Sequence, residues 1–216
     1  MIEMQGNTRC PAFYFQKGDI RLTYKLNYFS PKLPIDTTAN LWYNLITKRK
    51  EGNSMNSIWF DMDGTIADLY KVEGWLESLR SNDWSVYRKC APRHNYQRIN
   101  TAVEALIENG WQVGVITWAS KGIGWGKELD KIAEVKFAWL CEFFPALADG
   151  HFACIPYGHS KADFAEEINS CYEVAYLVDD NKEVRQEWRS HSCEYVKFKT
   201  INASRSFVRE LEGLVG

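Results

Sequence analysis

The chain has 216 residues, of which 45% are hydrophobic and 25% are charged, and its formal net charge is −2. This composition is typical of a globular protein and excludes a disordered or fibrous chain. No apolar stretch approaches the length of a bilayer-spanning helix, and the N-terminal MIEMQGNTRC lacks the apolar core of a signal peptide, so we expect no membrane partner.

The spacing of the cysteines and histidines indicates which metal sites are unexpected and in which redox compartment the protein is expected. The six cysteines are scattered without a CxxC pair, and the four histidines have no HExxH spacing. These spacings disfavour a zinc ribbon, a redox dithiol and a histidine metal site. We therefore expect reduced thiols in a cytoplasmic protein.

Residues 1–54 form an N-terminal extension with eight basic and four acidic residues and no sustained helical or strand period. Lys50-Glu51-Gly52 is the tripeptide that a purine-rich ribosome-binding sequence would encode if it were translated, and Met55 follows shortly after it. Two interpretations stay open. The extension is either a translated upstream stretch ahead of a natural start at Met55, or an arm that packs on the main domain.

Residues 55–216 form the main domain, with 18 basic against 24 acidic residues. An acidic domain binds long nucleic acids poorly, because the neutralisation of phosphates supplies most of that affinity. We therefore do not expect a nucleic acid as partner, and the sequence sets no oligomeric state.

Strands and helices alternate from Ser57 onward, which is typical of a parallel α/β sheet. We expect strands at residues 57–61, 112–117, 152–155, 175–178 and 195–198. We expect helices at residues 96–109, 127–144, 160–169, 182–190 and 204–214. The predicted fold class is therefore α/β, a Rossmann-like parallel sheet flanked by helices.

A further segment, residues 69–95, follows the loop after the first strand. Its sequence predicts two short helices, at residues 73–80 and 84–89. Ligands of open α/β sheets bind beyond the carboxyl ends of the strands. We interpret residues 69–95 as a small helical cap over that edge.

Polar side chains gather at or just beyond the carboxyl ends of four predicted strands. They are Asp61 and Asp63 after the first strand, Thr117 in the second, Lys161 after the third, and Asp179 and Asp180 after the fourth. Each one alone also fits a turn or a helix cap. Their shared placement favours a common site.

These motifs resemble the four signatures of the haloacid dehalogenase (HAD) superfamily. DMDGT follows an apolar strand, VIT closes a second strand, GHSKADF supplies a lysine, and LVDD closes a later strand. The resemblance covers about residues 57–198. Lys127 and Lys131 compete with Lys161 for the third motif, but they lie too close after Thr117 for the usual order.

The resemblance implies catalytic roles for four residues. Asp61 is the expected nucleophile, which forms an aspartyl-phosphate, and Asp63 the expected general acid and base. Thr117 is expected to bind a phosphoryl oxygen, and Lys161 to offset negative charge. In this family, an acid at position 63 favours phosphate-ester chemistry over ion pumping or carbon–halogen cleavage, with a mutase still open.

The resemblance also implies Mg²⁺ as cofactor. Its expected ligands are the Asp61 carboxylate, the Asp63 backbone carbonyl and Asp179. Asp180 is expected to bind directly, to bind through water, or to orient its neighbours.

Four further residues are expected at the substrate. Gly64 allows the sharp turn after Asp63, Thr65 begins the next loop, and Trp118 and Ser120 follow Thr117. The aromatic residues of this region either stack on a nucleobase or hold the cap in place. They are Trp75, Trp84, Tyr87 and Trp118.

The expected function is a Mg²⁺-dependent phosphomonoester hydrolase. Its expected substrate is a small phosphorylated metabolite, with a nucleoside monophosphate as the first candidate. One alternative is a phosphatase of nucleic-acid ends or of a phosphoprotein. Another is a non-catalytic HAD-fold binding protein.

Overall fold

The computed structural model describes residues 56–215, with gaps at 169–172 and at 195. The predictions for residues 1–54 lie outside the described residues. None of the helices in the described part of the chain is both long and apolar enough to cross a bilayer.

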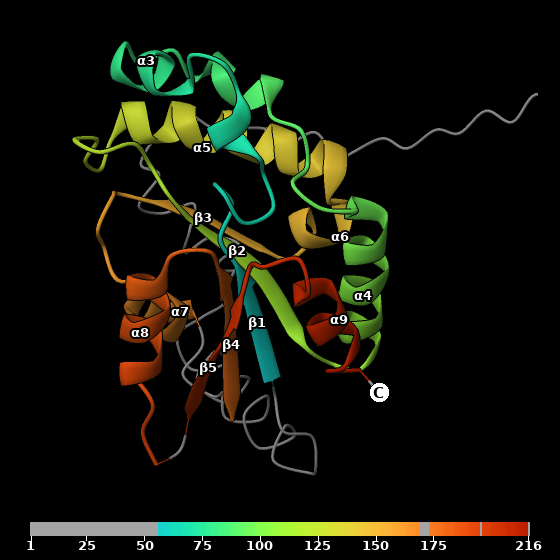
Figure 1. The fold of residues 1–216 in the computed structure, drawn as a ribbon. Coiled ribbons are helices and arrows are strands. Elements are labelled where there is room, and N and C mark those ends of the chain that lie inside the picture. The colour runs from blue at the N-terminus through green and yellow to red at the C-terminus, as the bar shows by residue number, and fades with distance from the viewer. Residues whose placement is uncertain (1–55, 169–172, 195, 216) are drawn as a thin grey trace, which may run out of the picture. The chain divides into compact units, whose positions relative to one another are not determined.

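Within the described residues, five parallel strands form one sheet in the order β3-β2-β1-β4-β5 (Figure 1). The strands are β1 (Asn56–Phe60), β2 (Gln112–Trp118), β3 (His151–Ile155), β4 (Val174–Asp179) and β5 (Lys197–Asn202). The chain runs outward from β1 to β3 and then returns to the other side of β1. This reversal creates a switch point between β1 and β4, where open α/β sheets bind ligands. The α/β prediction is confirmed.

The side chains of β1, the central strand, alternate between the two helix-covered faces of the sheet. Ile58 and Phe60 pack into one apolar cluster, whereas Trp59 packs into the other, because successive side chains of a strand point to opposite faces. The first cluster includes residues of α4 (Tyr96–Glu108), α5 (Lys127–Phe143), α6 (Pro145–Ala148) and α9 (Phe207–Glu212). The second includes residues of α7 (Lys161–Ile168) and α8 (Lys182–Ser190). Figure 1 shows α4 and α9 on one side of the sheet and α7 and α8 on the other.

Three short helices lie between β1 and α4. They are η1 (Leu69–Lys71), α3 (Trp75–Arg80) and η2 (Trp84–Lys89). Trp84 and Tyr87 of η2 are buried, η2 packs on α5, and the indole of Trp139 donates a 2.8 Å hydrogen bond to the carbonyl of Cys90. The two predicted short helices are therefore present, and their action as a cap stays a prediction.

The main differences from the predicted elements fall near the C-terminus. The last strand was predicted at residues 195–198, but it runs from Lys197 to Asn202 because it pairs along the whole of β4. The terminal helix was predicted at residues 204–214 and is shorter, Phe207–Glu212. A short helix that the sequence analysis did not predict, α6, begins at Pro145, since proline suits the first turn of a helix.

Candidate active site

The backbone of the central strands places two carboxylates side by side. Asp61 directly follows β1, and its N–H donates a 2.9 Å hydrogen bond to the carbonyl of Val178 in β4. Phe60 pairs with Val178, so Asp61 lies beside Asp179, the last residue of β4. Both carboxylates are buried at the carboxyl edge of the sheet, as the sequence predicts.

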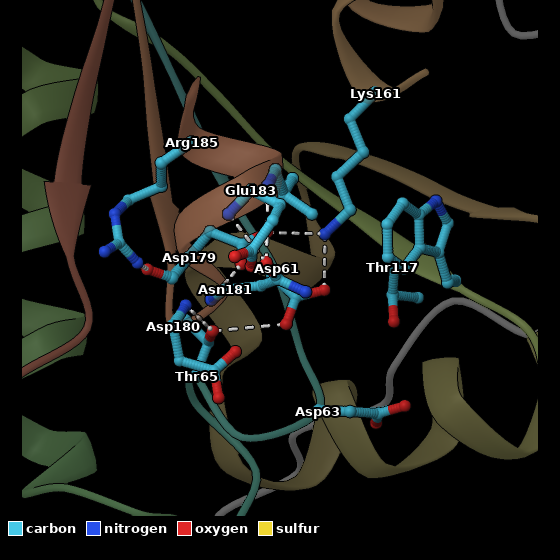
Figure 2. Close-up of polar contacts among 12 residues, drawn as sticks. Asp61, Asp63, Thr65, Thr117, Lys161, Asp179, Asp180, Asn181, Glu183 and Arg185 are labelled. Carbon is cyan, nitrogen blue, oxygen red and sulfur yellow. Dashed lines mark hydrogen bonds and ion pairs between the residues drawn. The ribbon is translucent and has the colours of Figure 1, made fainter. Parts of the chain in front are cut away.

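Lys161 joins these two carboxylates. Its Nζ lies 2.6 Å from Oδ1 of Asp61 and 2.8 Å from Oδ2 of Asp179 (Figure 2). Burial opposes its charged form, but the negative charges of Asp61 and Asp179 outweigh that effect and raise its pKa. The lysine is therefore held as an ammonium ion between two carboxylates.

The position of Lys161 follows from how α7 begins. The hydroxyl of Ser160 accepts a 3.1 Å hydrogen bond from the N–H of Asp163, so Ser160 caps the start of the helix. Lys161 is the first residue of the helix and is almost completely buried. The competitor Lys131 instead pairs with Glu128 on the surface.

Asp179 is held through both its carboxylate and its backbone carbonyl. Its Oδ1 accepts a 2.8 Å hydrogen bond from the N–H of Asn181, and its backbone carbonyl accepts one of 2.7 Å from Arg185. Burial raises the pKa of Asp179 to about 6; Lys161 works against this rise and Asp61 adds to it. Asp179 thus gains and loses a proton within a mildly acidic range.

Asp180 lies at the more open side of the group. Burial and the charge of Asp61 raise its pKa, while Arg93 works in the opposite direction. The guanidinium of Arg93 is 3.9 Å from Oδ2 of Asp180, so the contact is loose. Within the described part of the chain, Asp180 therefore has no close ammonium partner of the kind that Lys161 gives to Asp61 and Asp179.

Thr65 and Gly64, both predicted to bind substrate, are buried beside the carboxylates of Asp61 and Asp180. The Thr65 hydroxyl donates a 3.1 Å hydrogen bond to Oδ2 of Asp61 and accepts one of 3.1 Å from the N–H of Asp180. Gly64 has φ +80°, and a Cβ there would lie 2.6 Å from Oδ2 of Asp180 and also collide with the ring of Tyr70. Thr65 thus orients Asp61, and Gly64 lets the turn approach Asp180.

Asp63 belongs to a second group, which is built around Lys136. The Nζ of Lys136 lies 2.7 Å from Oδ2 of Asp63, 2.8 Å from Oγ1 of Thr117 and 2.7 Å from the carbonyl of Trp118. In Figure 2, Asp63 lies apart from Asp61 and Asp179. Burial raises the pKa of Asp63 although Lys136 lowers it.

The sequence analysis did not identify Lys136. It expected a helix at residues 127–144 and named no role for Lys136. In fact Lys136 lies four residues after Ile132 and four before Leu140, and all three are buried. That i, i+4 spacing was the available signal, since residues four apart share one face of a helix.

A cavity of about 590 Å³ opens above both groups. Asp61, Asp63 and Lys161 line it, and so do the predicted substrate residues Trp118 and Ser120. Five aromatic residues contribute to its wall: Tyr70, Trp75, Tyr87, Trp118 and Tyr157. The cavity thus joins a charged floor to aromatic sides.

The predicted residues differ in how they relate to this cavity. Gly64, Thr65 and Thr117 are fully buried and are not among its lining residues. Trp84 packs in the apolar cluster instead. The indole of Trp118 donates a 2.9 Å hydrogen bond to the carbonyl of His159, which fixes its ring at the wall.

The donor set near Asp61 fits a hard cation. Carboxylate oxygens of Asp61, Asp179 and Asp180 all lie within 4.8 Å of one another. Mg²⁺ prefers oxygen ligands, and carboxylates bind it in their ionised form. The carbonyl of Asp63, the further expected ligand, accepts a long 3.4 Å hydrogen bond from Tyr70.

The balance of charges around Asp61 also favours the binding of a divalent cation. The two groups contain four carboxylates, those of Asp61, Asp63, Asp179 and Asp180, against three cations: the ammonium ions of Lys136 and Lys161 and the more distant guanidinium of Arg93. Buried charges are stable only when they are paired. A divalent cation would supply the missing positive charge.

Comparisons with protein families and with curated sequences identify no relative of this chain. None of the protein families compared with the chain matches it, and no curated protein sequence matches it significantly. Membership of the HAD superfamily therefore stays a prediction from the motifs.

Proposed function

We propose that the chain is a Mg²⁺-dependent phosphomonoester hydrolase of the HAD type. The observation that carries the proposal is the group at the ends of β1 and β4. There a buried ammonium ion lies within 2.8 Å of both Asp61 and Asp179, on the floor of a cavity that Asp63 also lines. A carboxylate nucleophile needs such neutralisation before it can approach a phosphate dianion.

The reaction would proceed in two steps. In the first, a carboxylate oxygen of Asp61 bonds to phosphorus, the bond from phosphorus to the ester oxygen breaks, and Asp63 gives its proton to the departing alkoxide. In the second, Asp63 takes a proton from water, whose oxygen attacks phosphorus. Inorganic phosphate leaves and the Asp61 carboxylate is restored. The sum is ester plus water to alcohol plus phosphate.

The chain's own residues would prepare these steps. Thr65 orients Asp61 through its 3.1 Å hydrogen bond, and Lys161 holds positive charge beside it. The oxygen of Thr117, which is buried and does not line the cavity, accepts a hydrogen bond from Lys136 and would help to hold that ammonium group beside Asp63. Bound through Asp61, Asp179 and Asp180, Mg²⁺ would supply positive charge for the phosphoryl oxygens.

The aromatic wall supports a substrate with a flat group. The cavity of about 590 Å³ is within the range of small-molecule sites, and the rings of Trp118 and Tyr157 lie 4.9 Å apart at its side. A nucleoside monophosphate offers a base for these rings and a phosphate for the charged floor. It is therefore our first substrate candidate.

Phosphate release from a panel of phosphomonoesters tests the proposal. The panel contains nucleoside monophosphates, sugar phosphates, a 5′-phosphorylated oligonucleotide and a phosphopeptide, each with Mg²⁺ and with a chelator. We expect Mg²⁺-dependent release from a small ester, and its loss in Asp61→Asn.

Asp163→Asn is the matched control, because the Asp163 side chain is 67% exposed and lies on α7 away from the cavity lining. It should keep wild-type activity. Release only from the oligonucleotide or the phosphopeptide would change the substrate class. No release from any member by the wild type would contradict the proposal.

A further inference from the structure

Lys136 is a fully buried lysine whose three N–H donors all have acceptors. They bind Oδ2 of Asp63, Oγ1 of Thr117 and the carbonyl of Trp118, at 2.7 to 2.8 Å. Its Nζ also lies 4.8 Å from the centre of the Tyr87 ring. Four fixed neighbours leave the ammonium group with one position.

This arrangement makes the two oxygens of Asp63 different. Oδ2 is held by Lys136, whereas Oδ1 is buried and, within the described residues, has no hydrogen-bond partner. Among these residues, the bond from Lys136 to Oδ2 is therefore the contact that sets how the Asp63 carboxyl group lies. Asp63 lines the cavity, where its carboxyl group would meet the ester oxygen of a substrate.

Each of the two aspartates of the DMDGT motif therefore has its own lysine partner. Lys161 binds Asp61 and Asp179, and Lys136 binds Asp63 and Thr117. Among the described residues, Asp63 has its only close ammonium partner in Lys136. Without Lys136, no ammonium group among the described residues would fix the orientation of the Asp63 carboxylate.

We propose that Lys136 is a positioning residue for proton transfer to the leaving group: it fixes the carboxyl group of Asp63 at the cavity, where that group serves the ester oxygen. This inference rests on the proposed phosphatase function. The proton passes from the carboxyl group of Asp63 to the ester oxygen as the bond from that oxygen to phosphorus breaks. No other reactant takes part.

The dependence of the rate on the leaving group tests this role. An alkyl ester needs the proton, because an alkoxide is a poor leaving group, whereas p-nitrophenolate leaves without it. The ratio kcat/KM covers the steps up to release of the alcohol, so it isolates the first transfer. The esters are p-nitrophenyl phosphate and the best alkyl phosphate of the panel.

We expect Lys136→Met to lower kcat/KM for the alkyl ester by about 100-fold or more, and for p-nitrophenyl phosphate by less than about tenfold. Asp63→Asn should give the same pattern. Lys131→Met, an exposed lysine on the same helix, is the matched control and should change neither value. An equal loss on both esters would show that Lys136 supports only the structure.

A double variant keeps the test informative if Lys136→Met fails to fold. Asp63→Asn with Lys136→Met removes both buried charges, so no unpaired charge remains. If Lys136 acts through Asp63, the double variant matches Asp63→Asn alone on both esters. A further loss of tenfold or more on both would overturn the inference. An inactive wild type would instead refute the phosphatase proposal, and this inference with it.

Discussion

The ammonium group of Lys161 and the carboxylate of Asp61 lie 2.6 Å apart, although the two residues are 100 positions apart in the chain. The same ammonium lies 2.8 Å from Asp179. Lys161 thus connects α7 to the ends of β1 and β4. We therefore expect Lys161 to stabilise the fold and also to take part in the candidate site.

Lys161→Met should therefore lower both stability and activity. Removing the lysine leaves two buried carboxylates without their shared partner, which costs about 3–5 kcal/mol of unfolding free energy at neutral pH. Phosphate release should fall by about 100-fold or more. Urea unfolding and steady-state kinetics measure the two effects.

The control for this change is Lys131→Met. Lys131 pairs with Glu128 on the surface and its side chain is 61% exposed, so its loss should cost less than about 0.5 kcal/mol. Equal stabilities for the two variants would contradict the structural role of Lys161.

The protein without metal should become less stable as the pH rises from 4 to 6. Folding raises the pKa of Asp179 to about 6, so between these values the folded state binds a proton that the unfolded chain has released. The stabilisation is complete at low pH and is lost as the pH rises through 6, by about 2–3 kcal/mol. The raised pKa values of Asp63 and Asp180 act in the same direction.

Urea unfolding in a chelator, at several pH values, measures this slope. Asp179→Asn cannot titrate, so the difference between wild type and variant isolates Asp179 from other acids. Parallel curves for the two proteins would contradict the shift. Because ionised carboxylates bind the metal, Mg²⁺ should raise the melting temperature more at pH 7.5 than at pH 5.

A glycine pair separates backbone strain from crowding at the site. Gly64 and Gly110 both have φ +80°, but of the two only Gly64 has described residues within 4 Å of where a Cβ would be. Each change to alanine should cost about 1–2 kcal/mol through backbone strain. Gly64→Ala should also displace Tyr70 or Asp180 and so weaken Mg²⁺ binding.

Calorimetry of Mg²⁺ binding to the two alanine variants checks this. Gly110→Ala should bind Mg²⁺ as the wild type does. If Gly64→Ala also binds it with wild-type affinity, Asp180 does not contribute to the metal site.

Tyr157 should contribute to recognition of a base. Tyr157→Ala should raise KM for a nucleoside monophosphate about fivefold or more and leave KM for ribose 5-phosphate unchanged, because only the first has a base to stack. Trp125→Ala is the control. Trp125 is as exposed as Tyr157, 51% against 52%, but it does not line the cavity. Equal changes for both substrates would remove Tyr157 from base recognition.

The sequence predicts the central strands and their polar ends well, because buried parallel strands read as short apolar runs with turn residues after them. Asp61 and Asp179 fall where this reasoning expects them. It fails at β5, where Lys197 and Lys199 alternate with Phe198 and an exposed edge hides the pattern. Only pairing with β4 sets the bounds of that strand.

The sequence analysis also placed Asp63 in one group with Asp61, since only one residue separates them. The structure divides them, because Asp61 is bound by Lys161 and Asp63 by Lys136. A lysine in the middle of an amphipathic helix is normally exposed, so composition disfavours burial there. What overrides this is a long-range pairing between residues 73 positions apart, which no local pattern contains.

The hydrogen bond from Asp61 N–H to Val178 has one more consequence. The central strands of a sheet open only when the whole domain unfolds, whereas loops open locally. The amide of Asp61 should therefore exchange with deuterium as slowly as those of Ile58 and Phe60. The candidate nucleophile would then retain its alignment through every local fluctuation that admits or releases a ligand.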